Sequence, residues 1–397
     1  MSPCLHNLLV ALRAMSMMEE STIIRGTGDV FFQQIDSLAS LEDARLRYYT
    51  DDRSRMIFDW VQQYRVIESF YGHPIPIHLE NSPFREDEWA ALERQAKEMT
   101  PYIMDDYLLD RIDVWILEAY ALKGECEALP GDVVLDCGTY TGNTSLYFSK
   151  QVGASGHVYG FEAASNTFEK YRHNMRGIDN VTPVHVAVSN VTGSLRFSGD
   201  TAGARLAEYG EEVPAITLDD FCRSHSLSKV DYIKMDVEGA EDIALQGAIN
   251  TIQKYRPKMA ISAYHKAFDI ISLPSLILSI APYTFKLRHY SNCLWETVLY
   301  CIPCTTENVA YPAEQEVIPD QYNDLFFPLL SLLRNILRYQ HAITPFLARA
   351  AQGMQQLMEE LTNLNKVHAD LRKEFSDLGM ENIALRKLLK RRSAKNN

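Results

Sequence analysis

Two successive apolar runs each end on an acidic residue, and the first continues into a loop with two glycines. The stretch VVLDCGTYTGNTS places Asp136 at the end of its run and carries Gly138 and Gly142 in the loop. Glycines there let the backbone come close to a ligand. Glu162 ends the next run, HVYGFE, where a carboxylate can accept hydrogen bonds from both hydroxyls of a ribose. These residue types favour a bound nucleoside.

The loop lacks the spacing of a dinucleotide site. A G-x-G-x-x-G loop would hold a diphosphate, but Tyr140 occupies the place of the middle glycine. The carboxylate of Asp136 also suits a cationic ligand better than a diphosphate. A ribose and a positive charge together indicate S-adenosylmethionine. The ring of Tyr140 either covers this donor, contacts its sulfonium by cation–π attraction, or packs beneath the loop.

Methyl transfer to an oxygen also needs a group that removes the proton of the acceptor hydroxyl. The runs KMD, SAYH and LRH end on Asp236, His265 and His289, so these three are the candidate catalytic residues. A neutral imidazole accepts a proton near neutral pH, but a histidine is as often structural. The choice of base stays open. The residues predicted to bind the donor are Asp136, Gly138, Thr139, Tyr140, Gly142, Glu162 and Asp236.

The segment KMDVEGAE adds Lys234, Glu238 and Glu241 to Asp236. A lysine inside a strand needs a charged partner, so Lys234 is interpreted as the structural partner of a carboxylate. The two glutamates suit the N-terminus of the helix that follows. Asp236, Glu238 and a nearby acid could gather a divalent metal ion, as in some small-molecule O-methyltransferases, but we expect no metal.

Residues 126–305 alternate between short β-branched runs and helical stretches, which is typical of parallel βαβ units. The runs predicted to be strands are VVLDCG, HVYGFEA, VTPVHVAVS, DYIKMDVEG, KMAISAYH, TFKLRHYS and ETVLYCIP. Helices are expected between the first five runs. Because only SNCLW separates the last two runs, these are predicted to form an antiparallel hairpin that closes the sheet. In such an α/β sheet the ligand lies beyond the carboxyl ends of the strands.

Residues from about 130 to 303 resemble the FkbM family of S-adenosylmethionine-dependent methyltransferases. The resemblance rests on LDCGTYTGNT, VYGFEA, TLDDF, DYIKMDVEGAEDIALQGA and RPKMAISAYHK with LRHYSNCLWETVLY. It implies the Rossmann-like class I methyltransferase fold, a mostly parallel seven-stranded sheet with an antiparallel last pair, and an acceptor hydroxyl on a sugar or a polyketide-like product. Ala163 departs from the pattern, because the family more often has proline after the ribose glutamate.

The flanking segments differ in pattern from this domain. Residues 1–125 have helical spacing and many aromatics, which predict a helical N-terminal region, and residues 306–350 are predicted to be a helical linker. Residues 351–397 predict a coiled coil with a basic tail, in which residues 351–392 join a homodimer, with a trimer as the alternative. The leucines that recur every seven residues there are Leu357, Leu364, Leu371, Leu378 and Leu385.

Composition narrows the partners and the compartment. A formal net charge of -13 disfavours nucleic acid, which would need clustered lysines and arginines. The odd number of cysteines, 7, fits reduced thiols. The N-terminus lacks the basic start of a signal peptide, so the protein is expected in the cytoplasm. The apolar stretch LFFPLLSLLRNIL packs on the protein or contacts the inner face of the membrane.

Two functions follow from these features. The first is an S-adenosylmethionine-dependent O-methyltransferase that acts on a hydroxyl of a saccharide or another natural product. The alternative is an inactive donor-binding platform that serves as a coiled-coil assembly protein. The joint presence of Asp136, Gly138, Gly142, Glu162 and Asp236 favours the enzyme, because an assembly protein has no need of this set. The identity of the acceptor, and the choice between oxygen and nitrogen, are left open.

Overall fold

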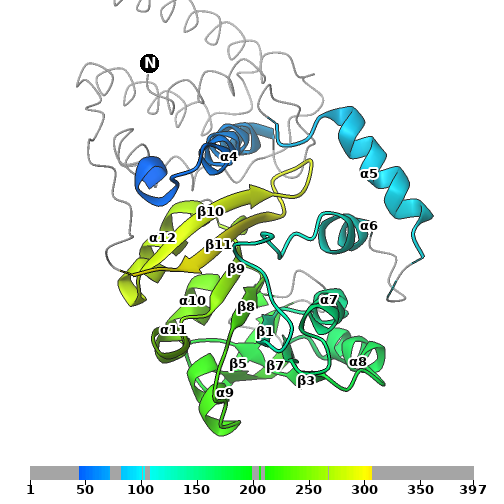
Figure 1. Ribbon diagram of the computed structural model, residues 1–397, viewed down its shortest axis with the longest axis vertical. Coiled ribbons are helices and arrows are strands. Elements are labelled where there is room, and N and C mark those ends of the chain that lie inside the picture. The colour runs from blue at the N-terminus through cyan, green and yellow to red at the C-terminus, as the bar shows by residue number, and fades with distance from the viewer. Residues whose placement is uncertain are drawn as a thin grey trace, which may run out of the picture.

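The computed structural model describes residues 44–71, 82–100, 102, 108–198, 205–206, 211–266 and 268–305. Its centre is a seven-stranded sheet in the order β10-β11-β9-β8-β1-β2-β3 (Figure 1). The strands are β1 (Val133–Cys137), β2 (His157–Glu162), β3 (Val181–His185), β8 (Tyr232–Met235), β9 (Lys258–Ser262), β10 (Tyr283–His289) and β11 (Thr297–Pro303). The predicted α/β class is confirmed, because this is the strand order of the class I methyltransferase fold.

Parallel pairing brings the carboxyl ends of five strands to one edge of the sheet. β3, β2, β1, β8 and β9 pair with one another in parallel. β10 and β11 form the predicted antiparallel hairpin, and β11 inserts between β10 and β9, antiparallel to both. A ligand site is expected beyond the carboxyl ends, near β1, where the strand order reverses.

Helices cover both faces of the sheet, because alternate strand residues point to opposite sides. Val134 and Tyr232 pack in one core with residues of α7 and α8. Leu135 and Ile233 pack in the other core with residues of α9, α10, α11 and α12. These helices are α7 (Asn143–Val152), α8 (Ser165–Asn174), α9 (Leu218–Ser224), α10 (Glu241–Gln246), α11 (Ile249–Tyr255) and α12 (Asp269–Ile280).

Two features of the domain are absent from the sequence prediction. A second, four-stranded sheet has the order β4-β7-β5-β6. Its strands are β4 (Ala187–Val188), β5 (Gly193–Ser198), β6 (Arg205–Leu206) and β7 (Glu211–Ile216). β5, β6 and β7 are short or rich in polar residues, so they lack the apolar runs that mark strands, and β4 lies within the run VTPVHVAVS, which is predicted as a single strand. The second feature is helix α12, which contains Pro274, a residue that disfavours a helix interior. Its serines Ser272, Ser275 and Ser279 share one exposed face.

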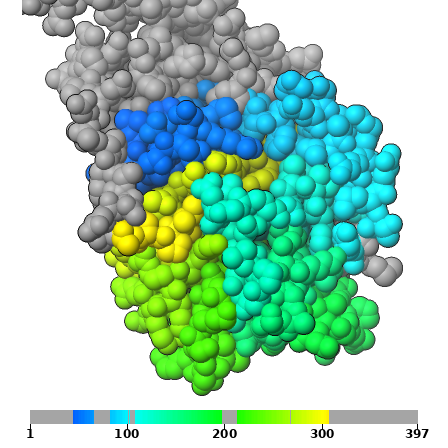
Figure 2. Space-filling model, in the orientation of Figure 1, coloured from blue at the N-terminus to red at the C-terminus, as the bar shows by residue number. Residues whose placement is uncertain are grey.

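The described part of the N-terminal region is helical, as predicted, and it extends the core of the domain. Its helices are α4 (Asp52–Tyr71), α5 (Glu86–Glu98), α6 (Leu108–Asp110) and the π-helix η2 (Arg111–Ile116). Tyr49, Phe58 and Trp60 share one hydrophobic core with Phe285 of β10. Figure 2 shows this segment in blue, directly against the yellow strands of the hairpin.

Several expectations concern parts of the chain that the structure does not describe. The linker at 306–350, the coiled coil at 351–397 and the apolar stretch that begins at Leu325 all lie outside the described residues. The boundary at residue 125 stays a prediction. Within the described ranges, the six cysteines are unpaired thiols and no helix has the length and apolar character that a membrane crossing needs.

His289 occupies a different place from the one expected. It ends β10, but its ring is buried and packs against Trp60 of α4, with the ring centroids 4.4 Å apart and the planes tilted by 49°. Nδ1 lies 2.8 Å from Oγ1 of Thr297, and Nε2 lies 3.4 Å from Oγ of Ser291. The expected position at the ligand cleft is therefore wrong: His289 joins the N-terminal helix to the sheet.

His289 should make the fold sensitive to acid. Burial lowers the pKa of His289 to about 3. Below about pH 6.5 this histidine is protonated in the unfolded chain but stays neutral in the folded chain. The free energy of unfolding therefore decreases by about 1.4 kcal/mol per pH unit as the pH falls from about 6.5 towards 3. We expect His289→Gln to remove this slope from the free energy of unfolding, measured by urea denaturation at several pH values. His173→Gln, at an exposed histidine, is the control; an equal loss of slope in both variants contradicts the prediction.

Candidate active site

A cleft opens at the carboxyl ends of β1, β2 and β8. Its empty volume is about 700 Å³, including space open to solvent. The lining residues are Gly138, Tyr140, Phe161, Glu162, Ala163, Ala164, Val186, Ala187, Val188, Asp236, Val237, Glu238 and Ala240. Of the residues predicted to bind a donor, Gly138, Tyr140, Glu162 and Asp236 line this cleft. Asp136, Thr139 and Gly142 do not.

The glycine loop after β1 is shaped by close contacts within the protein. Gly138 has φ +79°, and a Cβ there would lie 1.7 Å from the main-chain oxygen of Asp236. Gly142 has φ +102°, and a Cβ there would lie 2.6 Å from the ring of Tyr171. Both positions therefore require glycine. Gly142 lets the loop approach α8 rather than a ligand, which corrects its expected role, whereas Gly138 brings the end of β1 against the end of β8.

Asp136 lies beneath the loop instead of facing the cleft. Its side chain is fully buried, and Oδ2 accepts hydrogen bonds from Thr144 at 2.8 Å and Ser145 at 2.6 Å. Lys234 lies 3.5 Å from Oδ1 and also donates to the main-chain oxygen of Gly138. Lys234 thus is the structural partner that the sequence predicts. The expected contact between Asp136 and a cationic ligand is wrong, because Lys234 balances this carboxylate inside the protein.

Thr139 and Tyr140 complete the loop. The N–H groups of Gly138 and Thr139 both donate to the main-chain oxygen of Phe161, at 3.0 and 3.2 Å. The Thr139 side chain is buried below the cleft surface. Tyr140 has φ +51°, an uncommon conformation for a residue with a side chain. This conformation directs the N–H of Tyr140 to Glu162.

Glu162 stands at the middle of the cleft wall. Its Oε2 accepts the N–H of Tyr140 at 3.0 Å, and its Oε1 accepts the N–H of Ala164 at 2.8 Å. Burial raises the pKa of Glu162 to about 7, against the lowering effect of these N–H groups. Each carboxylate oxygen can accept more than one hydrogen bond, so the fixed carboxylate can still take hydroxyl groups of a ligand.

The two ends of the cleft differ in chemistry. Beyond Glu162, on the side of β4, the lining is apolar, with Ala163, Ala164 and Val186–Val188. On the side of β8 the lining carries the carboxylates of Asp236 and Glu238. From the β4 side to the β8 side, the cleft therefore presents an apolar surface, then a hydrogen-bond acceptor, then an acidic surface.

Asp236 follows β8 and presents one oxygen without a hydrogen-bond partner. Oδ2 accepts the hydroxyl of Tyr120 at 3.2 Å. Oδ1 is buried, lies 3.6 Å from Nε2 of His265, and accepts no hydrogen bond from any residue that the structure describes. As the sequence predicts, Asp236 is thus at the cleft with an oxygen that can accept a proton.

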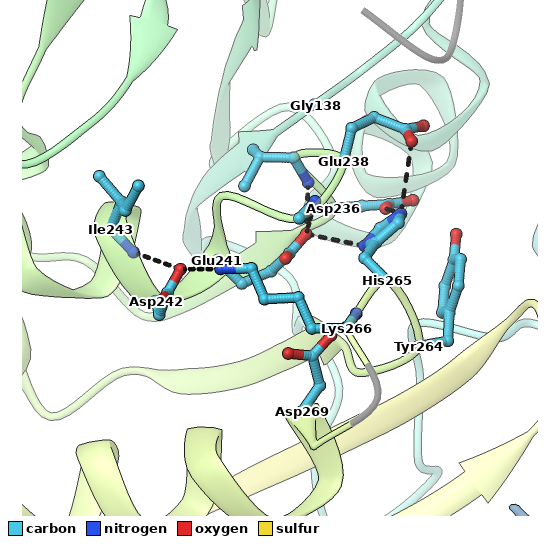
Figure 3. A network of polar contacts seen from close by, with 12 residues as sticks. Gly138, Asp236, Glu238, Glu241, Asp242, Ile243, Tyr264, His265, Lys266 and Asp269 are labelled. Carbon is cyan, nitrogen blue, oxygen red and sulfur yellow. Dashed lines mark hydrogen bonds and ion pairs between the residues drawn. The ribbon is translucent and has the colours of Figure 1, made fainter. Parts of the chain in front are cut away.

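His265 follows β9 and is surrounded by carboxylates (Figure 3). Nε2 lies 3.5 Å from Glu238 and 3.6 Å from Asp236, and Nδ1 lies 3.0 Å from Glu241. Burial lowers the pKa of His265, but the contact with Glu241 and the charges of all three carboxylates outweigh it and raise the pKa to about 9. The ring is then protonated at neutral pH and cannot act as the predicted base in this state.

Two further polar residues close to Asp236 are not identified by the sequence analysis. Tyr120 belongs to the N-terminal region and reaches Asp236 across 116 positions of the chain. Glu296, in the hairpin turn, has φ +63° and lies 3.4 Å from the hydroxyl of Tyr264. Burial, together with the charge of Asp236, raises the pKa of Glu296 to about 8. The position of Glu296 in the predicted hairpin turn is the one feature of the sequence that could have drawn attention to it. The sequence contains no motif that connects Tyr120 with Asp236.

Comparisons with known proteins agree with this geometry. The profile of the methyltransferase FkbM domain matches residues 136–283. The chain is 28% identical over 150 residues to the 2-O-methyltransferase NoeI of Sinorhizobium fredii, covering 32% of this chain and 61% of that protein. It is 27% identical over 133 residues to the hexuronic acid methyltransferase AglP of Haloferax volcanii, covering 32% of this chain and 54% of that protein.

The chain thus spans less than two thirds of the length of either relative. A solved structure of methyltransferase FkbM from Methylobacillus flagellatus is similar at 20% identity with a TM-score of 0.46, over 66% of this chain and 58% of that one. The matched residues run from the glycine loop through β8 and β9 to the start of β10, and so they include the whole cleft. Residues 136–283 of this chain therefore match the methyltransferase FkbM domain.

Proposed function

We propose that this chain transfers a methyl group from S-adenosylmethionine to a hydroxyl of a saccharide. The observation that carries the proposal is the placement of Glu162 and Asp236 on opposite sides of one cleft, at the ends of β2 and β8. Glu162 suits the ribose of the donor, and Asp236 suits a proton that leaves the acceptor. An assembly role needs neither group.

The cleft fits the parts of S-adenosylmethionine in order. The apolar lining by Ala163, Ala164 and Val186–Val188 suits a flat base, and the carboxylate of Glu162 suits the two ribose hydroxyls. Asp236 and Glu238 suit the positively charged sulfonium. Gly138, which no larger residue can replace, keeps the loop against Asp236 and so closes this side of the cleft.

When bound, S-adenosylmethionine would supply a methyl group on a sulfonium: the acceptor oxygen bonds to the methyl carbon in line while the carbon–sulfur bond breaks, and S-adenosylhomocysteine leaves as a neutral thioether. Oδ1 of Asp236 can take the hydroxyl proton, because it has no hydrogen-bond partner within the described ranges. Tyr120 holds Oδ2, and the protonated ring of His265 lies beside Oδ1, so the carboxylate is fixed at the cleft wall. Fixed geometry of this kind lowers the entropic cost of the reaction.

The acceptor class rests on the relatives and on the polar character of the β8 side. One relative is a 2-O-methyltransferase and the other acts on hexuronic acid. Asp236 and Glu238 place carboxylates on the acceptor side, and carboxylates accept hydrogen bonds from sugar hydroxyls. Both features support a carbohydrate hydroxyl as the acceptor.

Replacement of Asp236 should separate catalysis from donor binding. We expect Asp236→Asn to lower the rate of methyl transfer by about 10²-fold or more, because amide oxygen is a poor proton acceptor. Transfer of labelled methyl to a panel of saccharides, with S-adenosylhomocysteine binding measured in parallel, checks this. Asp242→Asn is the matched control, because Asp242 pairs with Lys266 and does not line the cleft. An unchanged rate of methyl transfer in Asp236→Asn would contradict the role of Asp236 as proton acceptor.

Replacement of Glu162 should change how donor affinity depends on pH. Because burial raises the pKa of Glu162 to about 7, the carboxyl becomes protonated at lower pH and offers fewer acceptor sites to the ribose. We expect the affinity for S-adenosylhomocysteine, measured by calorimetry, to decrease below pH 7. The loss should approach about tenfold per pH unit, because binding then requires the release of about one proton from Glu162.

In Glu162→Gln this pH dependence should disappear, and binding should weaken by about 1–3 kcal/mol for the lost hydrogen bonds to a charged group. Glu169→Gln, at an exposed glutamate of α8, is the control. The same pH dependence in wild type and Glu162→Gln would show that Glu162 does not contact the donor.

A further inference from the structure

We propose that Asp236, Glu241 and His265 bind a divalent transition-metal ion at the acidic end of the cleft. The inference goes beyond methyl transfer, because binding of the ion depends on neither the donor nor the acceptor. It also replaces the expectation from the sequence that the protein holds no metal.

The three side chains converge on one point although they come from three segments. Asp236 follows β8, Glu241 begins α10 and His265 follows β9. Each offers one ligand atom, and these atoms all lie within 4.8 Å of one another. Ligand atoms that share an ion at about 2.1 Å are separated by about 3.0 to 4.2 Å, depending on the angle at the ion. Nε2 of His265 and Oδ1 of Asp236 are 3.6 Å apart, which falls in this interval. Oε1 of Glu241 lies 3.0 Å from the other ring nitrogen, Nδ1, which leaves Oε2 of Glu241 as its ligand atom for the ion.

Two buried carboxylate oxygens in this cluster lack a donor. Glu241 has a side chain that is 1% exposed, and its Oε1 accepts the N–H groups of Val237 at 3.0 Å and Gly239 at 3.3 Å. Its Oε2 accepts no hydrogen bond from any described residue, and neither does Oδ1 of Asp236. Buried oxygens without partners are rare, since each loses its hydration without compensation. A bound cation satisfies both at once.

The charges around the cluster also favour a cation. Asp236, Glu238 and Glu241 surround a single imidazole, so the carboxylates outnumber the one positive charge of the protonated ring. A metal ion that binds the ring replaces its proton. The neighbouring lysines are engaged elsewhere, Lys266 with Asp242 at 2.7 Å and Lys234 with Asp136 at 3.5 Å. In the part of the chain that the structure describes, no lysine or arginine forms an ion pair with Asp236 or Glu241.

The donor set selects the class of ion. One imidazole and two carboxylates suit Mn²⁺, Fe²⁺ or Zn²⁺, whereas Mg²⁺ and Ca²⁺ prefer oxygen ligands alone. Nδ1 and Nε2 face different carboxylates, so when one nitrogen binds the ion the other can donate its proton to the facing carboxylate. An ion at this end of the cleft would occupy Oδ1 of Asp236, so in the metal-bound protein this oxygen would not take the acceptor proton. The ion would instead lower the pKa of an acceptor hydroxyl that binds to it.

Binding can be tested with Mn²⁺ alone, using the full chain after removal of metals by a chelator. Free Mn²⁺ has a strong electron paramagnetic resonance signal that disappears on binding, so a titration gives both stoichiometry and affinity. We expect one tightly bound equivalent, displaced by Zn²⁺ and only weakly by Mg²⁺. Glu241→Gln and Asp236→Asn should each weaken binding by at least about tenfold.

Asp242→Asn is the matched control and should bind Mn²⁺ as the wild type does, because Asp242 is outside the cluster and pairs with Lys266. Circular dichroism checks that each variant is folded. Glu241 also receives two main-chain N–H groups, so Asp236→Asn keeps the test informative if Glu241→Gln does not fold.

Absence of Mn²⁺ and Zn²⁺ binding to the folded wild type at millimolar concentration overturns the proposal. Equal binding by the wild type, Asp236→Asn and folded Glu241→Gln overturns it as well, because the ion then binds elsewhere. Since no donor or acceptor is present, either result leaves the proposed methyl transfer to be judged by its own assay.

Discussion

The buried ion pair between Lys234 and Asp136 is the interaction on which the site depends. It joins β8 to β1 at register partners, and neither side chain is exposed by more than 2%. Removal of one partner from a buried pair costs about 3–5 kcal/mol, because the other charge is left uncompensated. Lys234 also holds the carbonyl of Gly138, so the same contact fixes the loop that forms the cleft.

From this pair outward, charge is arranged in two layers. Asp136 and Lys234 neutralise each other below the surface, and Asp236, Glu238 and Glu241 gather around His265 above it. The lower layer makes the loop rigid, while the upper layer faces the cleft. An acidic residue at the end of a strand can thus either stabilise the loop from below or face the cleft, depending on which side of the loop it occupies.

The sequence predicts all seven strands of the main sheet, because each is an apolar run with a clear end. It also predicts Glu162 and Asp236 at the cleft, since both end such runs. It misplaces Asp136, Gly142 and His289, because burial against α7, α8 and α4 depends on packing across the chain. The ring of carboxylates around His265 depends on the order of the strands in space, and no spacing encodes it.

The contact between Trp60 and His289 has a consequence for synthesis of the chain. Tyr49 also bridges to Phe285, so this part of the N-terminal region packs on the last strands of the domain. Domains fold as units while the ribosome adds residues one by one. The contacts between this region and the end of the domain therefore form only after more than two hundred further residues have been synthesised, and until then these contact surfaces lack the partners described here. During this interval they are surfaces that a chaperone can recognise.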